Sequence, residues 1–274
     1  MQIASWNVNS VRTRLDHVLN WLEHSQADLL ALQETKVDDP QFPLEPFLQR
    51  GYQVQIHGQK AYNGVALISR TPLEDVRMGF SAELVDDAEA EELGAQKRVI
   101  SALIDGVRVV NLYVPNGSSL SSDKYSFKLT WLSCLERYLR AIQTRDEPLC
   151  VMGDFNIGLD AKDLPDPDRL TGGIMASDRE RKALRAALGP DLQDAFRLFE
   201  PNSGHWSWWD YRSGAWDRDR GWRIDHIYLD ETLRDVARSC SIDKQERGRI
   251  QPSDHAPVVV DLAWDFEDDE EVED

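Results

Sequence analysis

The sequence feature that most restricts the fold is a set of short apolar runs that end abruptly on polar residues. Residues 149–152 (LCVM) are all apolar, and Asp154 and Asn156 follow almost directly. A run this short, bounded by a glycine, is typical of a buried strand rather than of a helix. Because residues i and i+2 of an extended chain point to the same face, Asp154 and Asn156 are predicted to face one site together.

Four other predicted strand ends carry polar side chains of the same kinds. They supply Asn7 with Asn9, Glu34, Asp225, and Asp254 with His255. One polar residue at a strand end commonly caps a loop, whereas an acid embedded in an apolar strand, such as Asp225, needs a partner. Five such ends in one chain favour convergence on a single site over five unrelated loops.

Patterns of strands and helices alternate along the chain. Strands are predicted over residues 3–8, 29–33, 52–56, 65–69, 99–104, 107–114, 149–153, 223–229 and 256–263. Helical spacing predicts helices over residues 13–23, 123–144 and 178–188, the last with Ser177 as N-cap. The dipeptide Asp105–Gly106 favours a two-residue type I′ hairpin. Many hairpin strands with few long helices predict an α/β fold of two packed sheets flanked by helices.

The chain shows no fixed repeat and no linker rich in proline or serine, so a single domain is predicted over residues 1–264. Residues 265–274 hold eight carboxylates and no cation, and are predicted to be a disordered tail. A second acidic run, residues 82–92, holds six carboxylates and is predicted to be a solvated loop.

The composition limits the classes of protein to consider. A net charge of −18 argues at first sight against a nucleic-acid partner, because such proteins usually present a basic face. No apolar run approaches the ~20 residues that span a bilayer, and the first residues lack a secretory pattern. Three widely spaced cysteines make neither a disulfide framework nor a zinc pattern. We therefore expect a cytoplasmic protein without a membrane partner.

If the polar strand ends converge, the site is rich in oxygen ligands. Such ligands suit Mg²⁺ or Mn²⁺ rather than zinc. Glu34 is the predicted principal ligand, assisted by Asn7 or Asp254. His255 and Asp225 are candidates for an imidazole whose tautomer a carboxylate fixes. The sequence contains neither a Gly-x-Ser-x-Gly elbow nor a Walker loop.

Nine ordered motifs then point to one family. They are WNVNSVRTRL, LQETKVDD, GQKAYNGVALISR, NLYVPNG, KYSFKLTWL, GDFNI, WSWWDYRS, RGWRIDHIYL and PSDHAPV. With these motifs, residues 1 to about 264 closely resemble the bacterial exonuclease III and AP endonuclease family of the endonuclease/exonuclease/phosphatase superfamily. The resemblance implies a four-layered α/β sandwich, in which two mostly antiparallel sheets pack face to face with helices outside.

The resemblance also implies an activity and a partner. A monomeric, Mg²⁺-dependent DNA-repair nuclease would incise double-stranded DNA on the 5′ side of abasic sites. The same centre would remove nucleotides or blocking phosphates from DNA 3′ ends by in-line attack of water, in a cytoplasmic enzyme associated with the nucleoid when it acts.

The family's catalytic roles fall on residues present here. Asp154 would position or deprotonate the attacking water, and Asn156 would bind the scissile phosphate. His255, backed by Asp225, would hold a phosphate oxygen. Tyr113 would contact the phosphate or help the leaving group. The base is Asp154 or, as the alternative, His255. Asn7 would support Glu34, with Asp254 as a further metal ligand or a neighbour of the ligands.

DNA contacts are predicted from the same resemblance and from the tryptophan- and arginine-rich segment 205–225. Trp208, Trp222 and Ile224 would line a small apolar pocket for a sugar that lacks its base. Trp206 and Trp209 are predicted to fill the core. The remaining predicted DNA contacts are Lys36, Lys124, Lys128 and Arg212. Residues 159–181 form a loop whose contacts the sequence does not assign.

Two other functions are compatible with parts of the pattern. A superfamily relative could act on small phosphoesters such as inositol phosphates, but the tryptophan- and arginine-rich segment favours DNA. A regulator that binds nucleic acid without cleaving it would be expected to have lost catalytic positions. Glu34, Asp154, Asn156, Asp225 and His255 are all present.

Overall fold

The apolar runs of the sequence form the strands of two six-stranded sheets in the computed structural model, which describes residues 1–264. In order across the first sheet, the strands are β11 (Ala237–Ile242), β12 (Val258–Leu262), β1 (Gln2–Asn7), β2 (Leu29–Gln33), β4 (Val65–Ser69) and β3 (Gln53–His57). The second sheet runs β5 (Glu74–Met78), β6 (Val99–Ile104), β7 (Val107–Tyr113), β8 (Leu149–Asp154), β10 (Asp225–Leu229) and β9 (Gln193–Asp194). The predicted tail, residues 265–274, lies outside the described residues.

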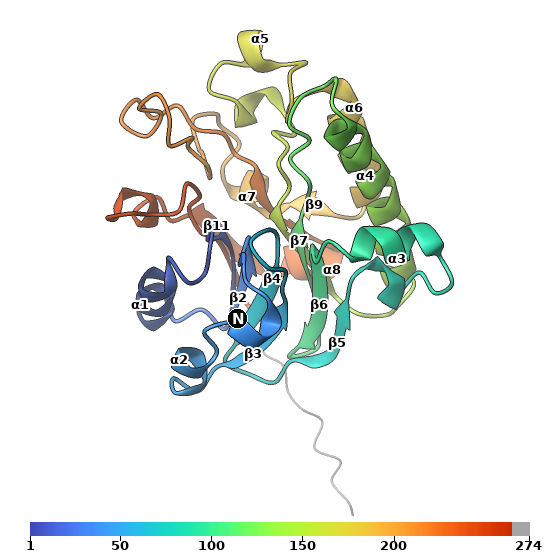
Figure 1. Ribbon diagram of the computed structural model, residues 1–274, viewed down its shortest axis with the longest axis vertical. Helices are drawn as coiled ribbons and strands as arrows, with labels where there is room; N and C mark the ends of the chain where they lie inside the picture. The colour runs from blue at the N-terminus through green and yellow to red at the C-terminus, as the bar shows by residue number, and fades with distance from the viewer. Residues whose placement is uncertain (265–274) are drawn as a thin grey trace, which may run out of the picture.

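Helices cover the outer faces of both sheets (Figure 1). Helices α1 (Leu15–Ser25) and α2 (Glu45–Leu48) lie outside the first sheet. On the opposite side of the molecule lie α3 (Ala88–Gly94), α4 (Asp123–Ile142) and α6 (Asp178–Leu188). Three short helices complete the set: α5 (Pro167–Leu170), α7 (Ala195–Phe199) and α8 (Glu231–Asp235).

Three apolar clusters fill the spaces between these layers. One lies between the sheets and joins residues such as Leu29 and Val260 to Val109 and Met152. The second packs α1 against the first sheet, and the third packs α4 and α6 against the second. The predicted four-layered sandwich is confirmed, and the two sheets share one apolar core.

The two sheets share a topology that places strand ends together. Each has one parallel pair at its centre, β1–β2 and β7–β8, and its other neighbours are antiparallel. Helices α1 and α4 make the crossovers within these pairs, because parallel neighbours need a long connection. The carboxyl ends of each parallel pair therefore lie at one edge of their sheet.

Local sequence signals predicted several elements correctly. The two-residue turn at Asp105–Gly106 has φ values of 47° and 75°, as a type I′ hairpin between β6 and β7 requires. Ser177 caps α6 through a capping box with Glu180. Helix α1 begins two residues later than predicted, since the segment 11–14 forms a turn instead.

Other segments were predicted wrongly or missed. The acidic run 82–92 is a loop only in part, because residues 88–92 belong to α3, with Asp87 as N-cap. Within it, Glu83 pairs with Arg77 and Arg145 at 2.6 Å. Strands β5, β9 and β11 were missed, since edge strands such as EDVRM and the two-residue β9 carry no continuous apolar run.

Two further expectations concern thiols and membranes. Cys134, Cys150 and Cys240 are buried and free, in agreement with the prediction of no disulfide framework. Among residues 1–264, no helix has the length and apolar character needed to cross a membrane.

Candidate active site

The polar strand ends meet at one end of the two-sheet sandwich. Asn7 and Glu34 end or follow β1 and β2 of the first sheet, and Tyr113 and Asp154 end β7 and β8 of the second. Strand β10 runs antiparallel to β8, so its first residue, Asp225, lies opposite Asp154. The convergence predicted from the sequence therefore occurs across both sheets, and each carboxyl end of a parallel pair supplies a side chain.

Asn7 joins the two sheets at the centre of the site. Its Nδ2 donates to Oε1 of Glu34 at 2.9 Å and to Oδ2 of Asp154 at 2.9 Å. The hydroxyl of Tyr113 donates to the same Glu34 oxygen at 2.8 Å. Lys36 pairs with the other oxygen, Oε2, at 2.8 Å. Asn7, Tyr113 and Lys36 together fix the position of the Glu34 carboxylate.

The imidazole of His255 is oriented by a carboxylate, as predicted. Its Nδ1 lies 2.8 Å from Oδ2 of Asp225, and both side chains are buried. This contact leaves Nε2 directed toward Asp154, 3.8 Å from its Oδ2. Because that separation exceeds a hydrogen bond, Nε2 is free to donate to a further group.

Burial and neighbouring charges shift the pKa values of this pair. Burial raises the pKa of Asp154 to about 7; Asp225 and Glu34 add to this rise, and His255 opposes it. Burial also disfavours the imidazolium of His255, but Asp225 and Asp154 outweigh it and raise its pKa to about 10. At neutral pH, His255 is therefore a cation, and Asp154 stands close to its own midpoint.

The charge of Glu34 is held by its partners. Burial alone would raise its pKa, but Lys36 and the amide of Asn7 keep the pKa below its ordinary value. The backbone is unusual here too, because Glu34 and Lys36 have φ values of 52° and 55°. Left-handed backbone at residues other than glycine is uncommon and costs free energy, and such strain occurs frequently at functional sites.

Asn156 is fixed beside Asp154 by its own hydrogen bonds. Its backbone N–H donates to Oδ1 of Asp154 at 2.8 Å. Its Nδ2 donates to the carbonyl of Val114 at 3.0 Å and to Oδ2 of Asp154 at 3.2 Å. Both amide hydrogens are thus engaged, and a phosphate oxygen would have to compete for one of them.

A metal ion fits the donor set of this site. Glu34, Asp154 and His255 each offer a ligand atom, and these atoms lie within 4.8 Å of one another. Since His255 is protonated at neutral pH, the oxygens of Glu34 and Asp154 are the available ligands. Two carboxylates suit a hard divalent cation.

The roles of Asn7 and Asp254 as metal ligands stay predictions. Asn7 directs its amide nitrogen to the two carboxylates and so holds both of them in place. Asp254 lies outside the cluster of Glu34, Asp154 and His255. Its oxygens accept from Asn9 at 3.0 Å and from the indole of Trp208 at 2.9 Å.

The aromatic segment packs against the same site. Trp208 pairs through its backbone with Trp222 and lies beside His255, with ring centroids 6.3 Å apart. Both tryptophans are partly exposed, whereas Ile224 is only 1% exposed. Their role as a pocket for an abasic sugar stays a prediction. Trp206 and Trp209 are buried in an apolar cluster, as expected.

The four predicted basic contacts have different surroundings. Lys124 is exposed, and Arg212 is exposed and pairs with Asp210. Lys36 is partly exposed and bound to Glu34 and to Asn9. Lys128 was predicted wrongly, because its side chain is completely buried and its ammonium pairs with Glu180. It cannot reach a DNA backbone from there.

A hollow of about 450 Å³ adjoins Tyr113. Arg98 and Lys124 contribute cations to its lining, and Asn63 and Asn116 contribute amides. The guanidinium of Arg98 lies 4.7 Å from the centroid of the Tyr113 ring. Sequence reasoning missed Arg98 and Asn116, although the NLYVPNG motif placed Asn116 three residues after Tyr113.

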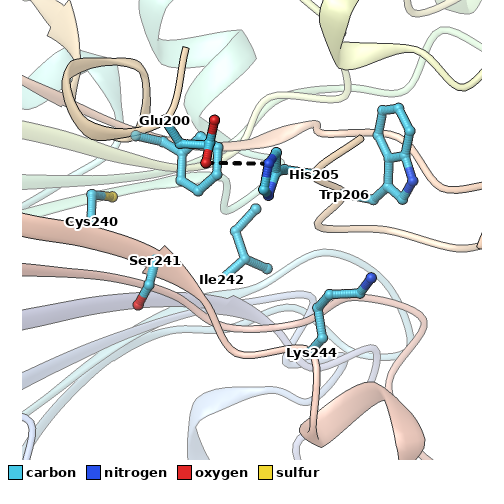
Figure 2. A pocket seen from close by; sticks show the side chains of 8 residues that line it. Glu200, His205, Trp206, Cys240, Ser241, Ile242 and Lys244 are labelled. Atoms are coloured by element: carbon cyan, nitrogen blue, oxygen red, sulfur yellow. Dashed lines mark ion pairs between the residues drawn. The ribbon is translucent and has the colours of Figure 1, made fainter. Parts of the chain in front are cut away.

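A second hollow, of about 260 Å³, lies apart from the catalytic cluster (Figure 2). His205 and Glu200 form an ion pair at its wall, 3.4 Å apart, and Cys240, Ile242 and Lys244 lie across from them. None of its lining residues is among those predicted to act in catalysis.

Comparisons with known proteins agree with this geometry. Residues 4–255 match the model of the Endonuclease/Exonuclease/phosphatase family. Exodeoxyribonuclease III of Haemophilus influenzae is 33% identical over 274 residues, which cover 96% of this chain and 100% of that protein.

Two solved structures are similar along almost the full length. One is a 3′ phosphatase, NExo, from Neisseria bound to a product DNA hairpin, with 38% identity and a TM-score of 0.90. The other is an AP endonuclease from Archaeoglobus fulgidus, with 35% identity and a TM-score of 0.88. Each comparison covers 96% of this chain and 100% of the other.

Proposed function

Because the chain belongs to the endonuclease/exonuclease/phosphatase family, we propose that it is a metal-dependent DNA-repair nuclease. It hydrolyses phosphodiesters on the 5′ side of abasic sites and removes nucleotides or blocking phosphates from DNA 3′ ends. The names of its relatives support both activities. The observation that carries the proposal is the meeting of Glu34, Asp154 and His255 around one position.

The proposed chemistry divides two tasks between Asp154 and His255. Asp154, with a pKa of about 7, accepts the proton of the attacking water. His255 is a cation whose Nδ1 is held by Asp225, so its Nε2–H donates to a phosphate oxygen. The difference between the two pKa values favours Asp154 as the base, since His255 keeps its proton at neutral pH.

Glu34 is the residue that would hold the cation in this proposal, which leaves Asp154 to act as the base, and Mg²⁺ is the ion that a carboxylate with surrounding water favours. When bound, the cation neutralises charge on the phosphate and lowers the pKa of a bound water. Asn7 and Tyr113 keep the Glu34 oxygen in place for it.

The hollow beside Tyr113 gives the DNA strand a path to the site. Arg98 and Lys124 supply positive charge there, and the exposed ring of Tyr62 supplies a surface on which a base can stack. These few cations act against a net charge of −18. Binding therefore depends on local contacts and not on the charge of the whole molecule.

The decisive experiment supplies a duplex with one abasic analogue and a second duplex with a 3′-phosphate. We expect the protein to incise the first and dephosphorylate the second with Mg²⁺, and to do neither with EDTA. Asp154→Asn should lower kcat by roughly 10²–10⁴-fold, the range for loss of a general base. Asp191→Asn, an exposed acid near the opposite end of the sheet, is the matched control and should keep full activity.

Two outcomes would reject the proposal. One is a folded protein that leaves both duplexes intact in Mg²⁺. The other is hydrolysis of an inositol phosphate with both duplexes untouched, which would favour the family's action on small phosphoesters.

A further inference from the structure

Helix α4 and helix α6 bury an ion pair that the proposed chemistry does not use. The side chains of Lys128 and Glu180 are both 0% exposed, and Nζ lies 2.7 Å from Oε1. Burying two charges costs free energy that their attraction seldom recovers in full, so such a pair is weak support for stability. Both groups also bind backbone atoms near the active site.

Lys128 binds the backbone of two residues at the active site. Its Nζ donates to the carbonyl of Asn156 at 2.8 Å and to the carbonyl of Asn116 at 3.2 Å. With Glu180, these contacts occupy all three donors of the ammonium. The two asparagines are also joined directly, because Asn116 Nδ2 donates to Asn156 Oδ1 at 2.9 Å.

Glu180 anchors the ammonium to the segment before α6. Its Oε1 also accepts from the backbone N–H of Met175 at 3.1 Å. Its Oε2 accepts from the backbone N–H and the hydroxyl of Ser177, at 3.1 Å and 2.6 Å. Met175 closes the network, since its sulfur lies 3.3 Å from Asn116 Nδ2.

The backbone held by Lys128 is strained. Asn156 has a φ of 50°, in the left-handed region. In this conformation its N–H and its side chain both reach Asp154. A strained residue keeps its conformation only where the surrounding structure over-determines it, and the ammonium on its carbonyl does so here.

We propose that Lys128, held by Glu180, is a positioning residue that fixes Asn156 and Asn116 against Asp154 in the geometry that catalysis needs. The inference rests on the proposed nuclease function. Lys128 acts through the two asparagines and makes no contact with DNA. Its loss should therefore lower kcat while leaving KM nearly unchanged.

The test compares two buried cations in the holoenzyme, with abasic duplex and Mg²⁺. Lys128→Met combined with Glu180→Gln removes the pair without leaving a buried charge unpaired. Arg108→Met is the matched control, because Arg108 is 1% exposed, pairs with Asp75 and Glu147 and lies at the far end of β7 from Tyr113. Thermal midpoints are measured for each, and all assays are run well below them.

In the Lys128→Met and Glu180→Gln double variant, here called the paired variant, we expect kcat to fall roughly tenfold or more and KM to stay within about threefold of the wild-type value. Arg108→Met should keep kcat within about threefold of the wild-type value. Lys128→Met with Glu180→Gln in an Asn156→Ala background should lower kcat by less than about threefold further, because interacting sites are not additive. Glu180→Gln alone leaves the ammonium in place, so its kcat should fall by a smaller factor than that of the Lys128→Met and Glu180→Gln double variant. This single variant can still be measured if the other variants fold poorly.

The inference is overturned if the paired variant and Glu180→Gln keep the wild-type kcat. It is also overturned if the combined Lys128→Met and Glu180→Gln substitutions cost the same factor with and without Asn156, since an additive loss is what a purely structural role predicts. An inactive wild-type protein in the same assay would reject the nuclease function itself, so the two failures are distinguishable.

Discussion

At the scale of single residues, the site works by setting opposite charge states on neighbouring groups. Asp154 and His255 are both buried and 3.8 Å apart. The aspartate is pushed toward its neutral form and the imidazole toward its charged form. Asp225 contributes to both shifts, because its negative charge repels that of Asp154 and attracts that of His255.

Removing the charge of Asp225 should move the alkaline limit of activity to lower pH. In the wild type, His255 keeps its proton up to about pH 10. In Asp225→Asn its pKa falls, since burial still opposes the cation and the main opposing charge is gone. The measurement is kcat/KM against pH in both proteins. An unchanged alkaline limit in Asp225→Asn would contradict the assignment of His255 as the proton-bearing group.

At the scale of elements, the site depends on the close approach of β7 and β8. Gly153 lies in β8 next to Asp154, with a φ of 147°. A Cβ atom at this position would lie 1.9 Å from the carbonyl oxygen of Leu112 in β7. The two strands end in Tyr113 and Asp154, so their spacing sets the distance between two groups of the site.

Gly153→Ala should therefore lower both stability and activity. We expect a loss of about 3 kcal/mol or more, because backbone must move to admit the methyl group. Gly51→Ala is the control: its φ is 80°, but no heavy atom lies within 4 Å of the added Cβ. It should cost about 1–2 kcal/mol, the strain alone, with kcat unchanged. Chemical denaturation measures the free energy of unfolding of both variants. Equal losses of stability in Gly153→Ala and Gly51→Ala would show that strand spacing is not the cause.

At the scale of the whole molecule, the two sheets bring like charges together. Glu34 comes from the first sheet, while Asp154 and Asp225 come from the second. Their mutual repulsion raises the pKa of Asp154. A cation that binds between the sheets relieves this repulsion and links the two layers, so metal binding should stabilise the fold.

Mg²⁺ should raise the thermal midpoint of unfolding. A ligand that binds only the folded state adds about 2.7 kcal/mol when present at 100 times its Kd. Glu34→Gln should weaken this response without unfolding the protein. NaCl at the same ionic strength is the control for screening. A midpoint that responds equally to Mg²⁺ and to NaCl would argue against a specific site.

Much of the fold and of the site could be read from local sequence. The hairpin at Asp105–Gly106 and the cap at Ser177 are set by neighbouring residues, and the structure confirms both. The polar strand ends were visible because an abrupt change from apolar to polar marks where a buried strand ends. Five of them gather at one end of the sandwich. Three lie at carboxyl ends of the parallel pairs, and the other two lie at the start of β10 and just before β12, strands that run antiparallel to those pairs.

The sequence by itself determined the strands with continuous apolar runs and the polar groups at their ends, because periodicity and turn chemistry act over a few residues, whereas it did not reveal the edge strands β5, β9 and β11. Only the tertiary structure decided which partners those polar groups contact. Lys128 looks like any lysine of an amphipathic helix until α4 packs against α6 and Glu180, 52 residues away, buries its charge. Asp254 likewise accepts hydrogen bonds from Trp208 and Asn9, which are far from it in the sequence. Long-range packing settles such pairings, because the free energy of a charge depends on its partners and its burial.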